Sequence, residues 1–268
     1  MHVNDVVARV KAHRCYTHPV FTHWAENAPS TEAIGALFHQ IRSFCDSTRP
    51  GLNLPEGLRN LGLRTESRLL EEIVESEEDH GPELAAMAGH ILNRSAGKTV
   101  CPNVFDQAAV EGTLKECSDR LLNSLPGYDK KSGLMPQTRN AIAVFERRKD
   151  MDEKSVYRNL GTTLALEMIS NRQLIPGEKL CLVDSGLYKA SLEEPEMHYL
   201  MEHWGEAGAE AQHEQNGINA IAQVLNPSTM PLVQEGADDF LNTVAAMWDL
   251  LDAALLESGQ RRLAATGT

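Results

Sequence analysis

The residues of this chain that could do metal chemistry are concentrated between positions 203 and 213. This segment contains His203, Glu206, Glu210 and His213, so four metal-binding side chains follow one another at steps of three, four and three residues. In a continuous α-helix, offsets of +3, +7 and +10 return to about −60°, −20° and −80° of the starting direction. A single helix would therefore place these imidazoles and carboxylates on one stripe.

A second cluster of acidic and histidine residues lies between positions 75 and 83, more than a hundred residues earlier. It contains the unit Glu77-x-x-His80, which recurs in the later segment as Glu210-x-x-His213. Helical bundles build dinuclear metal sites from glutamates and Glu-x-x-His pairs that project from several helices. A site rich in carboxylates, with a few imidazoles and no thiolate, favours iron or manganese over structural zinc. The two segments together predict two faces of one metal cavity.

A bridging carboxylate from a separate helix would complete such a site, and Glu167 is the best candidate. It stands in an otherwise apolar stretch at 160–169, interrupted only by two threonines. A buried glutamate is costly unless it is paired or coordinates a metal. The predicted metal ligands are therefore Glu77, His80, Glu167, His203, Glu210 and His213.

Each of these residues also has an ordinary structural interpretation. The acidic residues near position 77 could form a solvated helix face, and Glu206 with Glu210 could form an exposed acidic stripe. His80 could cap the helix that follows it. Glu206 stays undecided as a ligand, and Glu83 with His90, seven residues further on, forms a reserve pair if position 77 proves exposed.

The elements that must position these residues are helices, because helical periodicity dominates the chain and alternating runs typical of strands are nearly absent. Helices are expected at about 3–14, from 30 or 31 onward, from 56 or 65 to 74, and at 83–93, 104–124, 137–149, 152–172, 196–223 and 235–257, with connections at 49–55, 95–103, 126–136 and 175–195. We therefore expect an all-α fold in which seven or so helices form a single domain over residues 1–268, with a frayed end from about 258.

The bulk composition limits the classes of function. A chain of 268 residues with 42% hydrophobic content can bury a sizeable core. The net charge of −13 argues against nucleic acid or an anionic membrane surface as a partner, because both require clustered Lys and Arg. There is no apolar run of about 18 residues and no signal-peptide pattern. The five scattered cysteines fit reduced thiols. We expect a cytoplasmic protein that acts on a small molecule.

Together these residues resemble the haem-oxygenase-like di-metal oxidases and oxygenases, whose fold is shared with the thiaminase-type TenA proteins and the PQQ-synthesis protein. Residues 17–24, 29–32 and 38–40 look like the first two helices of that family. Residues 77–84 are similar to its Glu/His ligand helix, while 161–167 and 199–213 resemble the third ligand glutamate and the closing helix. The likeness covers most of residues 16–220.

Two departures from the family pattern leave ligand identities open. The family usually closes with His-x3-Asp-x2-His, whereas this chain has His203-x6-Glu210-x2-His213, with Glu206 at the place of the first histidine. The first ligand of this segment is therefore either His203 or Glu206. The spacing of the earlier ligand helix also varies within the family, so neighbouring acids could take the first position there, namely Glu71, Glu72 or Glu75.

The resemblance implies a seven-helix haem-oxygenase-like bundle and a non-haem di-iron centre that uses two Fe(II) ions, with Mn as the alternative metal and O2 as co-substrate. Members of the family act on amino acids, amines and fatty acids by N-oxygenation, desaturation or oxidative C–C cleavage, often in natural-product biosynthesis. A substrate that carries a carboxylate would need a cationic partner, which Arg42, Arg172 or Lys189 could supply.

Two other functions stay open at this point. A metal-free enzyme of the same fold, similar to TenA or the PQQ-synthesis protein, would work through acidic and basic side chains, and Cys45 or Cys15 could take part. A non-catalytic helical binding protein would turn its acidic stripes, including Glu167 and His213, towards solvent. A homodimer is compatible with either function, although no residue pattern argues for one.

Overall fold

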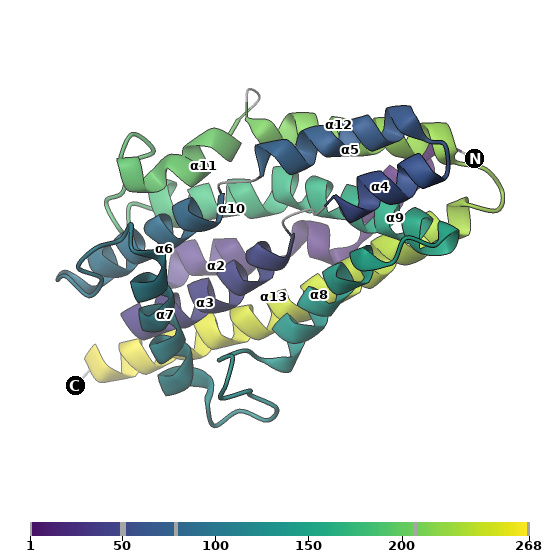
Figure 1. The fold of residues 1–268 in the computed structure, drawn as a ribbon. Coiled ribbons are helices and arrows are strands. Elements are labelled where there is room, and N and C mark those ends of the chain that lie inside the picture. Colours follow the sequence, from purple (N-terminus) through teal and green to yellow (C-terminus); the bar gives the residue numbers. More distant parts are fainter. Residues whose placement is uncertain (1, 49–51, 78–79, 206–207, 267–268) are drawn as a thin grey trace.

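The computed structural model describes residues 2–48, 52–77, 80–205 and 208–266 (Figure 1). In these ranges the regular structure is helical, apart from one isolated bridge between Asp129 and Leu134, so the predicted all-α class is confirmed. The α-helices are α1 (Val3–Ala12), α2 (Val20–Asn27), α3 (Thr31–Thr48), α4 (Asn53–Asn60), α5 (Arg64–Ser76), α6 (His80–Ala96), α7 (Gln107–Leu122), α8 (Pro136–Glu146), α9 (Glu153–Ile169), α10 (Ile175–Lys179), α11 (His198–His203), α12 (Ala209–Val224) and α13 (Met230–Thr266).

Several helices begin where capping residues and apolar spacing predict them. Helix α3 starts directly after Ser30, whose hydroxyl accepts a hydrogen bond from the Ala33 backbone N–H at 3.2 Å. Helix α7 starts after Asp106, whose carboxylate accepts from the Ala109 N–H at 3.1 Å. The predicted connection at 49–55 is shorter than expected, because α4 already begins at Asn53.

Helices α9 and α13 pack closely along their length, and their backbones touch. A Cβ atom on Gly161 of α9 would lie 1.9 Å from the Val233 carbonyl oxygen. A Cβ atom on Gly236 of α13 would lie 1.8 Å from the Arg158 carbonyl oxygen. Only glycine allows this approach, which places the two helix axes close together. Figure 1 shows α5 and α12 side by side along the opposite edge of the molecule from α13.

The first helices of the chain are attached to the last one. Arg9 of α1 donates to Asp238 of α13, with Nε to Oδ1 at 2.6 Å. Arg14, in a short 3-10 turn (Arg14–Thr17), makes a two-bond ion pair with Asp249 of α13, at 2.8 and 2.7 Å. Such exposed pairs add little stability, but they fix the direction in which the N-terminal helices cross α13.

The predicted helix at 196–223 is divided, so the prediction of one continuous stripe was wrong. Helix α11 ends at His203 and α12 begins at Ala209. Gly205 has a φ of +91°, which favours glycine and is incompatible with a continuing helix. A Cβ atom on Gly208 would lie 2.4 Å from the His203 carbonyl oxygen, so the chain folds back tightly at this point. Glu206 lies outside the described residues.

The predicted break at 175–195 begins later than expected, because the chain stays helical from Glu153 to Asp184. Pro176 has no N–H and cannot continue a regular α-helix. A π-turn at Ser170–Leu174 precedes it, in which the Ile175 N–H bonds to the Ser170 carbonyl five residues back. After α10 a second π-turn, Leu180–Asp184, ends this continuous helical segment. The wider turns carry the helix past the proline.

The last helix is longer than predicted. Helix α13 begins at Met230 rather than near 235, and Pro231 is tolerated because it stands in the first turn. The helical backbone continues to Thr266, through most of the segment that was expected to fray. In the described part of the chain, no helix has both the length and the apolarity needed to cross a membrane. All five cysteines are free thiols.

Candidate metal centre

The structure brings the six predicted ligand residues together inside the bundle. They come from two helix junctions and from the last turn of α9. Glu77 follows the last residue of α5, His80 opens α6, His203 closes α11, and α12 supplies the remaining pair from its first two turns. The six residues are Glu77, His80, Glu167, His203, Glu210 and His213.

Glu77 lies at the centre of the cluster. Its Oε2 is 2.8 Å from Nδ1 of His80, and its Oε1 is 3.7 Å from Nε2 of His203 and 3.4 Å from Nδ1 of His213. Glu77 and His80 belong to different helices, so their contact does not come from the i, i+3 spacing within one helix that the sequence suggested. It comes from the close approach of the end of α5 and the start of α6.

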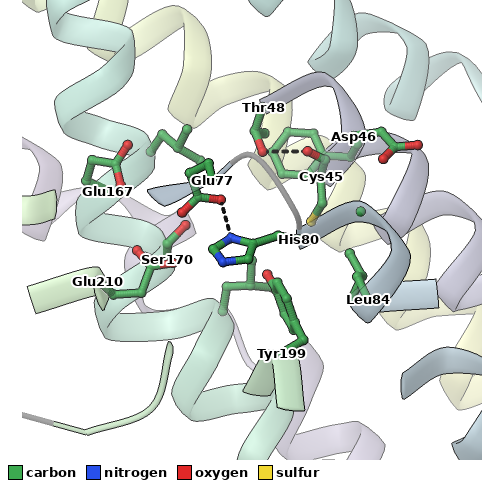
Figure 2. A pocket seen from close by; sticks show the side chains of 14 residues that line it. Cys45, Asp46, Thr48, Glu77, His80, Leu84, Glu167, Ser170, Tyr199 and Glu210 are labelled. Atoms are coloured by element: carbon green, nitrogen blue, oxygen red, sulfur yellow. Dashed lines mark hydrogen bonds and ion pairs between the residues drawn. The ribbon is translucent and has the colours of Figure 1, made fainter. Parts of the chain in front are cut away.

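The remaining contacts extend the cluster to α9 and α12. His203 Nε2 is 3.9 Å from Glu210 Oε1, and His213 Nδ1 is 3.6 Å from Glu167 Oε2. In the view of Figure 2, Glu167 and Glu210 lie on one side of the His80 ring. Glu167 and His213 are 5% and 4% exposed, which removes the main expectation of the non-catalytic binding protein.

Within the centre, two groups of three described residues have ligand atoms within 4.8 Å of one another. One is Glu77, His80 and His203, and the other is Glu77, Glu210 and His213. Glu77 belongs to both, so it occupies the bridging position between them. The sequence had suggested Glu167 for that role, whereas neither of the two groups includes Glu167, whose Oε2 lies 3.6 Å from His213 Nδ1.

Two of the imidazoles form a hydrogen bond through the ring nitrogen that faces away from Glu77. His203 Nδ1 lies 2.6 Å from the Tyr199 carbonyl oxygen, to which it donates, and this leaves Nε2 with a lone pair towards the centre. His213 Nε2 lies 2.7 Å from Ser76 Oγ, which leaves Nδ1 facing the centre. Metal-binding histidines are usually oriented by such a partner on the second nitrogen. Sequence reasoning missed both partners, although Tyr199 stands one helical turn before His203.

Several polar atoms of the centre have no hydrogen-bond partner. Among the described residues, His203 Nε2, His213 Nδ1 and Glu210 Oε2 are buried and unsatisfied. A buried polar group left without a partner costs about 1–3 kcal/mol. A cation bound by all three atoms would remove this cost. The residues present therefore fit a divalent metal ion.

Burial and mutual charge set the protonation of the centre. Burial, and then repulsion from Glu167 and Glu77, raise the pKa of Glu210 well above its usual range. Burial alone would raise the pKa of Glu77 too, but the facing imidazoles of His203 and His80 hold it far below its ordinary value. Burial lowers the pKa of His213 to about 4, so this imidazole is neutral and can offer its lone pair.

A pocket opens on the centre from the side of α3. Cys45, Asp46 and Thr48 line it together with Leu84 and Tyr199, and Figure 2 shows Cys45 and Leu84 on the side of His80 away from Glu167. Burial raises the pKa of the Cys45 thiol well above its usual range, so the thiol stays protonated and is a poor nucleophile.

Cys15, the other thiol considered for a metal-free enzyme, lies in the hydrophobic core. Burial raises its pKa to about 12. A protonated thiol is a weak nucleophile, so neither Cys15 nor Cys45 favours thiol chemistry. The metal-free alternative therefore loses its two candidate thiols, whereas its acidic and imidazole side chains are still present.

The three cations considered for substrate binding occupy different places. Arg172 lines a hollow that also contains Asn171, His203 and Trp204. Arg42 instead pairs with Asp46 at 3.1 Å. Lys189 is exposed in the connection at 185–194. Arg172 is therefore the one of the three that shares a hollow with a predicted ligand.

The alternative acids before position 77 are directed elsewhere. Glu71 forms an ion pair with Arg59, and Glu72 accepts a hydrogen bond from Asn216 at 3.2 Å. Glu75 is exposed. Each is therefore occupied or solvated outside the centre.

Glu83 and His90, the reserve pair of ligands, contact different partners. Glu83 contacts His198 at 2.9 Å, on the outer side of α6, while His90 contacts Glu194 at 3.1 Å. The two residues therefore do not share one ion. Glu206, the other open candidate, belongs to the part of the chain that is not described, so His203 is the first ligand candidate of its segment that can be placed.

One buried carboxylate near the centre was not predicted at all. Glu178 of α10 is 1% exposed, and neither of its carboxylate oxygens has a hydrogen-bond partner among the described residues. Burial raises its pKa to about 8. Its segment was expected to be a broken connection, where a glutamate is usually solvated. A signal was present, because apolar residues flank it on both sides at 174–175 and 180–183.

No protein-family model matches the chain, and no curated protein matches its sequence. The six converging side chains offer three carboxylates and three imidazoles. This set of donors is typical of iron or manganese centres in helical bundles.

Proposed function

We propose that this chain is a non-haem di-iron oxidoreductase with a haem-oxygenase-like bundle. It uses O2 to oxidise a small amino-acid-like or carboxylate substrate by N-oxygenation, desaturation or C–C cleavage, in natural-product biosynthesis. Two Fe(II) ions are the proposed metals, with Mn as the alternative. The proposed setting is the cytoplasm, and the net charge of −13 argues against a nucleic-acid partner.

The observation that carries this proposal is that two groups of ligand atoms share Glu77. Each group combines carboxylate and imidazole donors within 4.8 Å, and each contains a buried ring nitrogen without a hydrogen-bond partner. A carboxylate with two oxygens can bind one ion through each of them. The arrangement of Glu77, with Oε2 near His80 and Oε1 near His213, supports two adjacent ions.

The chain's own residues would prepare the centre for this chemistry. A pair of bound ferrous ions supplies the electrons that reduce O2. The Tyr199 carbonyl and the Ser76 hydroxyl keep the inner nitrogens of His203 and His213 directed at the metal positions. The side chains of Leu84, Leu166 and Leu174 give the pocket an apolar wall that limits access of water.

The hollow beside His203 supports binding of a carboxylate substrate. Arg172 lines this hollow and its side chain is 55% exposed. Its Nε pairs with Glu214 at 3.1 Å, which leaves the two terminal nitrogens of the guanidinium as further donors. A guanidinium can bind a carboxylate through two parallel hydrogen bonds. Arg172 is therefore the proposed anchor of the substrate.

Anaerobic iron loading tests the proposal. Metal-free protein is incubated with ferrous salt, passed through a desalting column, and assayed for iron per chain. We expect the buried centre to retain close to two ions per chain, followed by a transient visible absorption when O2 is mixed in. Glu77→Gln is expected to lose most of the iron, because Glu77 belongs to both ligand groups.

Glu75→Gln is the matched control, since Glu75 is an exposed glutamate two residues before Glu77. It should bind as much iron as the unchanged protein. Failure of the unchanged protein to take up iron or manganese would overturn the proposal. Equal iron content in Glu75→Gln and Glu77→Gln would also overturn it, because the shared carboxylate would then have no role.

A further inference from the structure

A second cluster of metal-binding side chains lies on the outer side of His80. It consists of Glu83 on α6, His198 and Glu202 on α11, and Nε2 of His80. His198 Nδ1 is 2.9 Å from Glu83 Oε1, and His198 Nε2 is 3.3 Å from Glu202 Oε1. Glu202 and His198 are each 43% exposed, so this outer cluster is open to solvent, unlike the buried centre.

His80 links the outer cluster to the buried centre. Its side chain is 10% exposed, and its Nδ1 contacts Glu77 at 2.8 Å. Its other ring nitrogen, Nε2, lies 4.0 Å from Glu202 Oε2. That separation is too long for a hydrogen bond, but it is within the limit of about 4.2 Å for two ligands that each bind one ion at about 2.1 Å.

The carboxylates of the outer cluster lack the partners that neutralise acids elsewhere. Among the described residues, neither Glu83 nor Glu202 has an ion pair with a lysine or arginine. Glu83 Oε2 is buried and has no hydrogen-bond partner. By contrast, Glu194, which contacts a histidine of the same helix α6, is also paired with Arg94. The outer cluster therefore has excess negative charge and an unsatisfied oxygen.

We infer that the outer cluster is a separate binding site for a first-row divalent cation such as Mn²⁺ or Fe²⁺. The ligands are Nε2 of His80 and the carboxylates of Glu83 and Glu202, whose ligand atoms lie within 4.8 Å of one another. His198 contacts both carboxylates and acts as a positioning residue. Mixed imidazole and carboxylate donors in an exposed site suit these ions.

The place of this site also gives it a role, which rests on the proposed function. The outer cluster lies on the solvent side of His80, and His80 contacts both clusters. A cation bound at the outer cluster, on the Nε2 side of His80, would enter the centre by moving past this ring to Glu77 on the Nδ1 side. The outer site is therefore an entry site that supplies the buried centre with metal from solvent.

Manganese titration of metal-free, full-length protein tests this inference. Free Mn²⁺ gives a sharp six-line EPR spectrum that bound Mn²⁺ loses, so the number of bound ions and their affinities can be measured directly. The double variant Glu83→Gln/Glu202→Gln is expected to bind one ion fewer per chain and to fill the buried centre more slowly. His198→Gln is expected to weaken the outer site by about tenfold, because it removes an orienting contact.

Glu196→Gln is the matched control, since Glu196 lies 4.0 Å from a ring nitrogen of His90 on α6, as Glu202 does from His80. It should bind Mn²⁺ as the unchanged protein does. The inference is overturned if the double variant, folded by circular dichroism, binds the same number of ions with the same affinities. Glu77→Gln separates the two proposals. If that variant binds as many ions as the unchanged protein, while the double variant loses one, the buried centre fails and the outer site stands.

Discussion

Glu178 allows a quantitative prediction, because it is a buried carboxylate with no hydrogen-bond partner for either oxygen among the described residues. Burial raises its pKa from 4.5 to about 8. In the folded protein it keeps its proton up to about pH 8, whereas in the unfolded chain it loses the proton above about 4.5. Unfolding therefore releases a proton between these values, and the stability of the protein falls as the pH rises through this window.

The size of the effect follows from the two pKa values. A rise from 4.5 to about 8 corresponds to about 5 kcal/mol at pH 8 as an upper limit, at about 1.4 kcal/mol for each pH unit. Glu178→Gln keeps the shape of the side chain and removes its charge. We therefore expect the variant and the unchanged protein to be similarly stable at pH 4.5, and the variant to be more stable at pH 8 by several kcal/mol.

Urea unfolding of metal-free protein, followed by circular dichroism at pH 4.5 and pH 8, measures this difference. Glu193→Gln is the control, because Glu193 is exposed and its replacement should leave the pH dependence unchanged. The reasoning is refuted if Glu178→Gln loses stability with pH as steeply as the unchanged protein does. That result would mean that the carboxylate is already ionised in the folded state.

Three further predictions concern the glycines and the metal. Gly161→Ala should lower the free energy of unfolding in urea by about 3 kcal/mol, because its Cβ would lie 1.9 Å from the Val233 oxygen. Gly217→Ala is the control, since its Cβ would have its nearest contact at 3.5 Å. It should leave the free energy of unfolding unchanged or raise it by up to about 1 kcal/mol. Gly208→Ala should displace His203, whose carbonyl oxygen would lie 2.4 Å from the new Cβ, and weaken manganese binding measured by EPR. Manganese at one hundred times its dissociation constant should stabilise the protein by about 2.7 kcal/mol in urea, and chelator should reverse this.

The parts of the fold that local patterns specify could be predicted from the sequence. The cap at Ser30 and the apolar spacing after it predict α3, and α3 begins at Thr31. The convergence of acids and imidazoles from distant segments was also predicted, because a buried Glu167 needs a partner whatever the details of its neighbours. Their role as metal ligands remains a proposal.

The break between α11 and α12 could not be predicted from local patterns. The alanines at 207, 209 and 211 favour a continuous helix, and the offsets from His203 to His213 fit one helical face. Gly205 and Gly208 were the available signals, but a glycine within a helical pattern is also tolerated. The tight return of the chain at the His203 carbonyl is a contact between residues five apart, which a periodicity count does not detect.

Glu178 and Ser76 were missed for a different physical reason. Pro176 and Gly177 indicate a break in the helix, whereas a π-turn carries the helix past them. The role of Ser76 depends on His213, which lies on another helix. Contacts of this kind arise only from packing, so the residues that orient a ligand are harder to find in a sequence than the ligand itself.

The attachment of the first helices to the last one has a consequence for synthesis of the protein. Arg9 and Arg14 find their partners Asp238 and Asp249 more than two hundred residues later. While the chain is being translated, α1 and its neighbouring turn leave the ribosome long before α13 exists. The N-terminal segment therefore cannot pack against α13 until nearly the whole polypeptide has emerged. Until then its apolar side is exposed and accessible to chaperones.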